Sequence, residues 1–198
     1  LVSTRFERSS FVIRQAGKAL PVPMIRKLIA SPRFCEFLKQ KIHLINSILE
    51  DVKDIPFDKM PKCIVHSDIK KENVLVNNNT VYIIDFGNSY IGNRLIDLVR
   101  IIMWFFLKNN DFNIEEIENC FKVYFENNHL IDLEYNSLGK IIKFCVIYNL
   151  IKDVYLFEKG FLSENYVVKN DTKWLNVLEN EQLLEKVKEA LNNASRYS

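Results

Sequence analysis

The stretch that decides the fold spans residues 65–87 and reads VHSDIKKENVLVNNNTVYIIDFG. It opens with a polar loop and continues as two arms rich in β-branched residues, at 73–76 and 81–84. Three asparagines between the arms tolerate the left-handed backbone that a tight turn requires. The pattern therefore predicts a short β-hairpin that ends in Asp-Phe-Gly.

Helical patterns lie on both sides of this hairpin. Apolar residues recur at helical spacing after Arg33, and the chain from Arg94 onward reads as a block of helices. Within that block, Asn113 followed by Glu116 resembles a capping box. The helices are expected over these ranges: 94–107, 113–128, 134–158 and 181–193. The layout predicts an α+β fold, mostly helical with one short hairpin.

Composition excludes several classes of function. The chain has 198 residues, of which 48% are hydrophobic, enough to bury the core of one domain. Its formal net charge of +2 argues against a dedicated nucleic-acid binder. The longest apolar run, 101–107, is far shorter than the roughly 20 residues of a membrane span. Four cysteines without C-x-x-C spacing predict reduced, mostly buried thiols and a cytoplasmic protein.

Three polar side chains of the decisive stretch suit phosphoryl transfer. Transfer from ATP requires Mg²⁺ held by hard oxygen ligands and a carboxylate beside the acceptor hydroxyl. Asp68 lies in the polar loop, Asn73 ends that loop, and Asp85 ends the second arm of the hairpin. Antiparallel arms bring Asn73 and Asp85 together although they are twelve residues apart. The sequence thus predicts a two-ligand metal site beside Asp68.

The run 65–86 resembles the catalytic loop and metal-binding strand of the protein-kinase-like superfamily. This resemblance implies a C-terminal kinase lobe that uses ATP as co-substrate and Mg²⁺ as cofactor. It implies Asp68 as the catalytic base and Asn73 and Asp85 as the metal ligands. His66 would give structural support to the loop.

The segment after Asp85 separates the branches of that superfamily. It contains no long activation loop and no Ala-Pro-Glu; instead Gly92 precedes an aspartate-leucine pair at Asp97. This resembles the aminoglycoside phosphotransferase and choline kinase family, which includes homoserine kinases. The resemblance implies that Asp97 supports the loop by accepting hydrogen bonds from backbone amides around 66–68. It also implies that helices within 94–193 line the pocket of a small-molecule hydroxyl acceptor, such as an aminoglycoside, an amino alcohol or a sugar.

Lys70 leaves other branches open. Many serine/threonine protein kinases carry a lysine at this position that reaches the transferred phosphate, whereas small-molecule kinases usually do not. We include Lys70 among the catalytic residues, and it favours the atypical protein kinases of the RIO-like and Bud32-like groups, which also lack a long activation loop. Sugar kinases of the lipopolysaccharide core share the same loop. No acceptor residue is assigned among the candidates of the helical block: Trp104, Tyr148, Asp153 and Tyr155.

The chain before His66 is too short for a complete ATP-binding lobe and has no Gly-rich phosphate loop. We predict that 1–32 is a remnant or linker from the N-terminal side and that 33–198 is the C-terminal lobe. That lobe would hold the catalytic loop 66–73 and the metal-binding strand end 85–87. An ATP-binding lobe is expected upstream or missing, and no ATP-binding residue is assigned. A non-catalytic, pseudokinase-like scaffold that depends on a partner is the alternative from a different class.

Overall fold

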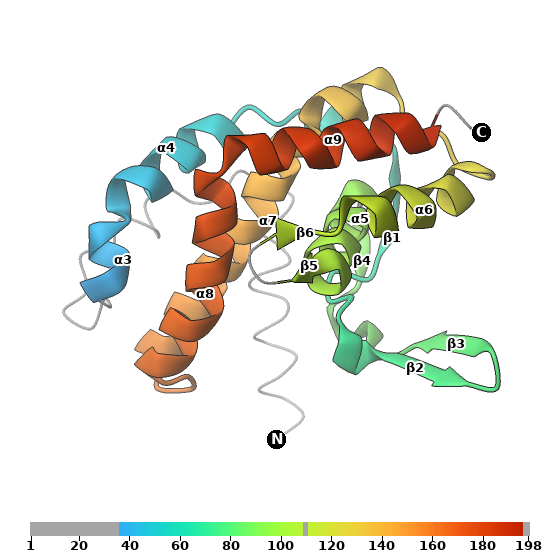
Figure 1. The fold of residues 1–198 in the computed structure, drawn as a ribbon. Helices are drawn as coiled ribbons and strands as arrows, with labels where there is room; N and C mark the ends of the chain where they lie inside the picture. Colours follow the sequence, from blue (N-terminus) through green and yellow to red (C-terminus); the bar gives the residue numbers. More distant parts are fainter. Residues whose placement is uncertain (1–35, 109–110, 196–198) are drawn as a thin grey trace. The chain divides into compact units, whose positions relative to one another are not determined.

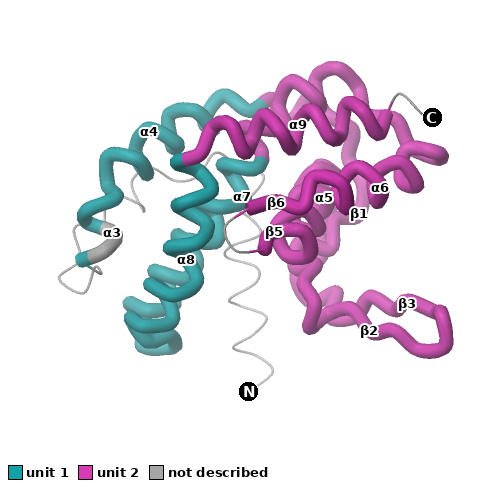
Figure 2. Tube along the Cα trace, viewed as in Figure 1, with its two compact units in different colours: residues 1–55, 142–179 teal, residues 56–141, 180–198 magenta. Residues whose placement is uncertain are grey.

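The computed structural model describes residues 36–108 and 111–195. The predicted N-terminal remnant, 1–32, lies outside these described residues. Contacts between Cα atoms divide the chain into two compact units, which are coloured separately in Figure 2. Unit 1 takes Leu1–Ile55 and Ile142–Glu179, and unit 2 takes Pro56–Ile141 and Asn180–Ser198.

Three small antiparallel sheets belong to unit 2, each with two strands. The pairs are β1 (Lys62–Val65) with β4 (Tyr90–Asn93), β2 (Val74–Asn77) with β3 (Thr80–Ile83), and β5 (Leu107–Lys108) with β6 (Asp111–Phe112). The predicted hairpin is β2–β3, and it projects from the rest of unit 2 (Figure 1). Asn78 and Asn79 form its two-residue turn with φ angles of 45° and 64°. Positive φ at both positions is what a type I′ turn requires, and asparagine adopts it readily.

Helices form the rest of unit 2. Their bounds are η1 (Phe57–Lys59), η2 (Lys71–Asn73), η3 (Phe86–Asn88), α5 (Leu95–Ile101), the π-helical turn η4 (Ile102–Phe106), α6 (Ile114–Phe125), the part of α7 (Asp132–Glu158) up to Ile141, and α9 (Glu181–Ser195). Helix α6 buries Ile117, Phe121 and Phe125, and it packs against α9, which buries Val187 and Leu191 (Figure 1). This apolar contact forms a core for the unit, because both stripes recur at helical spacing.

Unit 1 is built from helices in its described part. They are α3 (Glu36–Gln40), α4 (Ile42–Val52), the part of α7 (Asp132–Glu158) from Ile142 onward, and α8 (Glu164–Glu179). Two ion pairs join segments that are distant in sequence: Lys41 to Glu179 at 2.5 Å and Lys143 to Asp51 at 2.6 Å. Exposed pairs of this kind contribute at most about 1 kcal/mol each, so the apolar contacts hold the unit together.

The predicted fold class is confirmed, since the described chain is mostly helical with small antiparallel sheets. The capping box is seen in part, because the Asn113 side chain accepts a hydrogen bond from the backbone N–H of Glu116 at 3.2 Å. The helical block is interrupted by β5–β6, and α8 and β4 were not predicted. The helices over the described residues include none that is long and apolar enough to cross a membrane.

One expectation about the cysteines was wrong. Of the three in the described part of the chain, Cys63 and Cys120 are exposed and only Cys145 is buried. Cys63 lies in β1, a strand in which only the last residue is buried, and Cys120 lies on the solvent side of α6. Burial therefore does not explain why these thiols are present.

Candidate active site

The loop between β1 and η2 is held by a side chain that follows it by about thirty residues. The backbone N–H groups of His66 and Ser67 donate to the two carboxylate oxygens of Asp97, at 2.7 Å and 2.8 Å. Ser67 adopts a φ of 63°, in the left-handed region, so the backbone changes direction directly after these two N–H groups. Its hydroxyl donates to the carbonyl oxygen of Asn88 at 2.7 Å. The loop is thereby tied both to α5 and to η3.

His66 is buried and contacts both sides of the site through its ring. The backbone N–H of Asp68 donates to Nδ1 at 3.2 Å, and Nε2 lies 2.9 Å from the carbonyl oxygen of Ile84. Because Nδ1 accepts, the ring proton belongs on Nε2, where it can be donated to Ile84. The ring of Phe86 meets the imidazole edge to face, with centroids 4.6 Å apart. His66 therefore links the loop to the end of the hairpin.

Asp68 receives two donors on one carboxylate oxygen. Lys70 Nζ lies 2.9 Å from Oδ2, and the side-chain amide of Asn73 donates to the same oxygen at 3.2 Å. The Asn73 amide also donates to the Asp68 backbone carbonyl at 2.8 Å. No hydrogen bond from the described residues reaches the other oxygen, Oδ1. Asp68 is thus fixed on one side and open on the other.

The hairpin brings the two predicted metal ligands to the same end of the sheet. The backbone N–H of Ile84 donates to the carbonyl oxygen of Asn73 at 3.0 Å, which sets Asp85 one residue beyond this pairing. Asp85 is exposed and has φ 65° and ψ 57°, a left-handed conformation that costs a non-glycine residue about 1–3 kcal/mol. A Cβ on Gly87 would lie 3.3 Å from Asp85 Oδ1, so the carboxylate bends back over the glycine.

The donors at this end of the hairpin are oxygen atoms of the kind that Mg²⁺ prefers. Asn73 uses its amide nitrogen toward Asp68, so its Oδ1 is left to serve as a ligand. Asp85 offers a solvent-facing carboxylate. Across 36–108 and 111–195, no group of three or more His, Cys, Asp or Glu residues could hold a metal. The two donors fit a Mg²⁺ that keeps water and substrate phosphates as its other ligands, but not a metal held only by protein groups.

The sequence did not single out Ser67, although its N–H and its hydroxyl both help to hold the loop. A serine beside a catalytic motif carries no signal of its own; the positive φ becomes visible only in the folded chain. Cys63 lies three residues before His66. Partial burial raises the pKa of its thiol, and the negative charge of Asp97 raises this pKa further. The thiol stays protonated near neutral pH and is not a nucleophile here.

The four acceptor candidates lie apart from this loop in the chain. Trp104 belongs to η4 in unit 2, and Tyr148, Asp153 and Tyr155 belong to the part of α7 in unit 1. Tyr148 stacks on Phe144 with ring centroids 6.2 Å apart, a contact that suits core packing. None of the four gains an acceptor role from these contacts.

Comparison with known proteins adds one match. A sequence model described as "APH: Phosphotransferase enzyme family" matches residues 29–120. The matched stretch contains the predicted catalytic loop 66–73, the β2–β3 hairpin and Asp97. No curated protein matches the chain. The match supports the resemblance to the aminoglycoside phosphotransferase and choline kinase family, and residues 29–120 of the chain are similar to the phosphotransferase enzyme family.

Proposed function

We propose that this protein transfers the γ-phosphate of ATP to a hydroxyl of a small molecule in a Mg²⁺-dependent reaction. The observation that carries the proposal is Asp68, with Oδ2 held by Lys70 and Asn73 and Oδ1 open. A carboxylate fixed in this way can accept a hydrogen bond from an acceptor hydroxyl at its open oxygen. The family match over residues 29–120 supports the reaction class, since the matched family is one of phosphotransferases.

In the proposed reaction the acceptor oxygen forms a bond to the γ-phosphorus while the bond between that phosphorus and the ADP oxygen breaks. The hydroxyl proton passes to Asp68, and ADP leaves with the electron pair of the broken bond. Positioning and charge neutralisation supply most of the acceleration in such reactions, so Asp68 need not be a strong base. Asn73 and Asp85 would hold Mg²⁺, which when bound neutralises charge on the ATP phosphates.

Lys70 is proposed to contact the transferred phosphate. Its Nζ pairs with Asp68 at 2.9 Å, and about a third of its side chain is exposed, so it can turn toward an incoming anion. That exchange would leave the Asn73 amide as the donor that still holds Asp68 Oδ2 when phosphate arrives. His66 and Asp97 are proposed to support the loop, which their hydrogen bonds to it favour.

The exposed apolar surface of the β2–β3 hairpin supports the expectation of a separate ATP-binding lobe. Five large apolar side chains of this hairpin are at least 45% exposed: Leu75, Val76, Val81, Tyr82 and Ile83. The pairs Leu75–Tyr82 and Val76–Val81 face opposite sides of the hairpin, so both faces are apolar, and exposed apolar surface of this kind usually marks a surface that another element or a ligand covers. We propose that a lobe outside the described residues covers it when ATP is bound.

The test is phosphotransfer by the full chain with radiolabelled ATP and Mg²⁺ against a panel of hydroxyl acceptors: aminoglycosides, amino alcohols and sugars. Asp68→Asn should lower kcat by about 100-fold or more with little change in ATP affinity. Asp58→Asn is the matched control, because Asp58 is an exposed aspartate of η1 that makes no contact with the loop.

Asp85→Ala separates the proposed metal site from the proposed base. It should weaken Mg²⁺-dependent ATP binding about tenfold, because one of two protein ligands is lost. Equal ATP binding by wild type and Asp85→Ala would contradict the assigned metal ligands. A chain that binds ATP without transferring phosphate to any acceptor would favour the scaffold, and transfer to a protein hydroxyl would favour the RIO-like alternative.

A further inference from the structure

An ion pair lies at the start of the helix that carries Asp97. Arg94 makes a two-point contact with Glu134: Nε lies 3.0 Å from Oε1 and Nη2 lies 2.8 Å from Oε2. The Glu134 side chain has 0% exposure, and that of Arg94 has 21%. Bidentate geometry fixes both the distance and the orientation of the guanidinium. The hydrogen bond that Arg94 donates to Glu134 raises the pKa of Arg94, which therefore stays charged.

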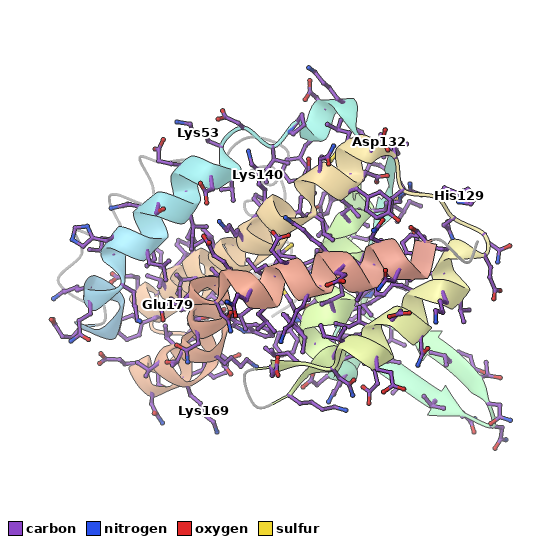
Figure 3. All side chains as sticks on the ribbon, turned by 45° about the horizontal axis from the view of Figure 1, so that its top comes forward. Lys53, His129, Asp132, Lys140, Lys169 and Glu179 are labelled. Carbon is purple, nitrogen blue, oxygen red and sulfur yellow. The ribbon has the colours of Figure 1, made fainter. Side chains whose placement is uncertain are left out.

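Glu134 is itself anchored at the first turn of α7. Its Oε2 accepts a hydrogen bond from the backbone N–H of Ile131 at 3.1 Å, the contact by which a glutamate reaches back to the residue before its helix. Arg94 Nη2 also donates to the carbonyl oxygen of His129. Figure 3 labels His129 in the loop before α7 and Asp132 at the beginning of the helix. The pair therefore ties the start of α5 to the start of α7.

The backbone of Arg94 continues directly into the support of the catalytic loop. Its carbonyl oxygen accepts hydrogen bonds from the N–H groups of Asp97 and Leu98, at 3.1 Å and 3.3 Å, which form the first turn of α5. Asp97 in turn accepts from the N–H groups of His66 and Ser67. A shift of Arg94 would thus move the carboxylate to which the loop is bound.

We propose that Arg94 and Glu134 are positioning residues for the phosphotransfer loop, and that they act through Asp97. The inference rests on the proposed function, because it assigns a catalytic consequence to the position of the loop. Neither residue belongs to the motif that predicted the site. They set the position of Asp97, and Asp97 sets the position of the backbone N–H groups of His66 and Ser67.

A purely structural role is the competing explanation. Removing one partner of a buried ion pair leaves an uncompensated charge and destabilises a fold, whereas the intact pair contributes little net stability. The location of this pair favours positioning, because its guanidinium lies three residues before Asp97 in the turn that orients it. The apolar contact of α6 with α9 already supplies a core for the unit.

Glu134→Gln is the variant of choice, because it keeps the shape of the side chain and leaves Arg94, which is partly exposed, to be solvated. Arg94→Lys is the second variant, since it keeps the charge and loses the two-point geometry. Val187→Ala is the control: it removes buried volume from α9 in the same unit and leaves α5 untouched.

Two readouts are needed, one of which does not depend on activity. Amide hydrogen exchange at His66 and Ser67 should become about tenfold faster in Glu134→Gln and stay near the wild-type rate in Val187→Ala. In the transfer assay, kcat should fall by about 10- to 100-fold with KM for ATP unchanged, because a displaced loop misplaces the reacting groups without removing a binding contact. Arg94→Lys should lie between Glu134→Gln and wild type in both measurements.

Equal exchange at the two amides in Glu134→Gln and Val187→Ala would overturn the positioning role, as would a kcat that falls no further than in the control. A wild-type chain that transfers no phosphate to any acceptor would instead contradict the proposed function. The exchange rates would still decide whether the pair holds the loop.

Discussion

Two aspartates in helices of this protein meet opposite surroundings. Asp97, in α5 of unit 2, accepts a backbone hydrogen bond on each of its carboxylate oxygens. Asp171, in α8 of unit 1, is 2% exposed, and its Oδ2 finds no hydrogen-bond partner among the described residues. Burial raises the pKa of Asp171 to about 8, with a further contribution from the charge of Asp153 and an opposing one from Lys152 and Lys173.

The difference shows that a carboxylate inside a fold can organise its surroundings only when hydrogen-bond donors compensate its charge. At Asp97 the negative charge is matched by two N–H dipoles, so it can organise a loop. At Asp171 the same group is desolvated and only partly compensated by Lys152 and Lys173, so the folded chain holds its proton up to a pH of about 8. The exchange of aspartate for asparagine should therefore have opposite signs at the two positions. The two tryptophans, Trp104 in unit 2 and Trp174 in unit 1, allow each unit to be followed in a single-tryptophan background.

The largest effect is expected for Asp97→Asn. Asparagine offers one acceptor oxygen, and its NH₂ group would face a backbone N–H, so one of the two loop amides loses its partner. Hydrogen bonds to a charged group contribute about 1.5–3 kcal/mol each, and we expect a loss of about 3 kcal/mol. Urea unfolding followed through Trp104 in a Trp174→Phe background measures it. A loss below about 1 kcal/mol would mean that the loop is held by other contacts.

Asp171→Asn should have the opposite sign above neutral pH. The folded carboxyl has a pKa of about 8 and an unfolded one about 4, so the folded chain binds more protons between these values. Wild-type stability should then fall as pH rises through this window. At about pH 9 we expect Asp171→Asn to be more stable than wild type by about 2 kcal/mol, a value discounted for the burial of an unpaired amide.

The check is a pH series of urea unfolding followed through Trp174 in a Trp104→Phe background. At about pH 4 the wild-type carboxyl is protonated in the folded chain, so Asp171→Asn should be no more stable than wild type there and should show only the cost of its unpaired amide. A stability difference that does not grow from pH 4 to pH 9 would show that Asp171 is charged in the fold and that a partner outside the described residues neutralises it.

The smallest change in stability is expected at the solvent-exposed N-cap of α6. Asn113 accepts from the N–H of Glu116 at 3.2 Å at the beginning of α6. Asn113→Ala should cost about 1 kcal/mol, the usual contribution of a helix N-cap. The Trp104 probe used for Asp97→Asn measures it, with Asn113→Ser as the control that keeps a capping oxygen. If the alanine and serine variants prove equally stable, the side-chain cap does not stabilise α6.

The same two aspartates explain what the sequence could and could not predict. The spacing from Asp85 to Asp97 identified Asp97 as a partner of the loop, because the family motif fixes which carboxylate follows the hairpin. Helix α8 was missed because of Asp171. The helix buries Val167, Asp171, Trp174 and Leu178. The aspartate interrupts what would otherwise be an apolar stripe at helical spacing. A buried stripe whose second residue is charged does not read as the apolar face of an amphipathic helix.

Other misses have simple physical causes. Strand β4 contains Gly92 and Asn93 and has no alternating pattern, so its pairing with β1 depends on a partner that local sequence does not reveal. Strands β5 and β6 have two residues each, too few for any periodicity. The hairpin was predictable because its arms and its asparagine turn agree. The Arg94–Glu134 pair was not, since nothing local links residues forty positions apart.

Surface turns are normally where a protein accepts an inserted residue, a tag or a fused domain. The Asn78–Asn79 turn is an exception, although it lies at the tip of an exposed hairpin. The arms it joins bury little that could restore their alignment, so the turn length alone decides which residues face each other. One extra residue would slide one arm past the other and carry Asp85 away from Asn73. In protein engineering and in the divergence of related genes, insertions and deletions in this two-residue turn should therefore not be tolerated.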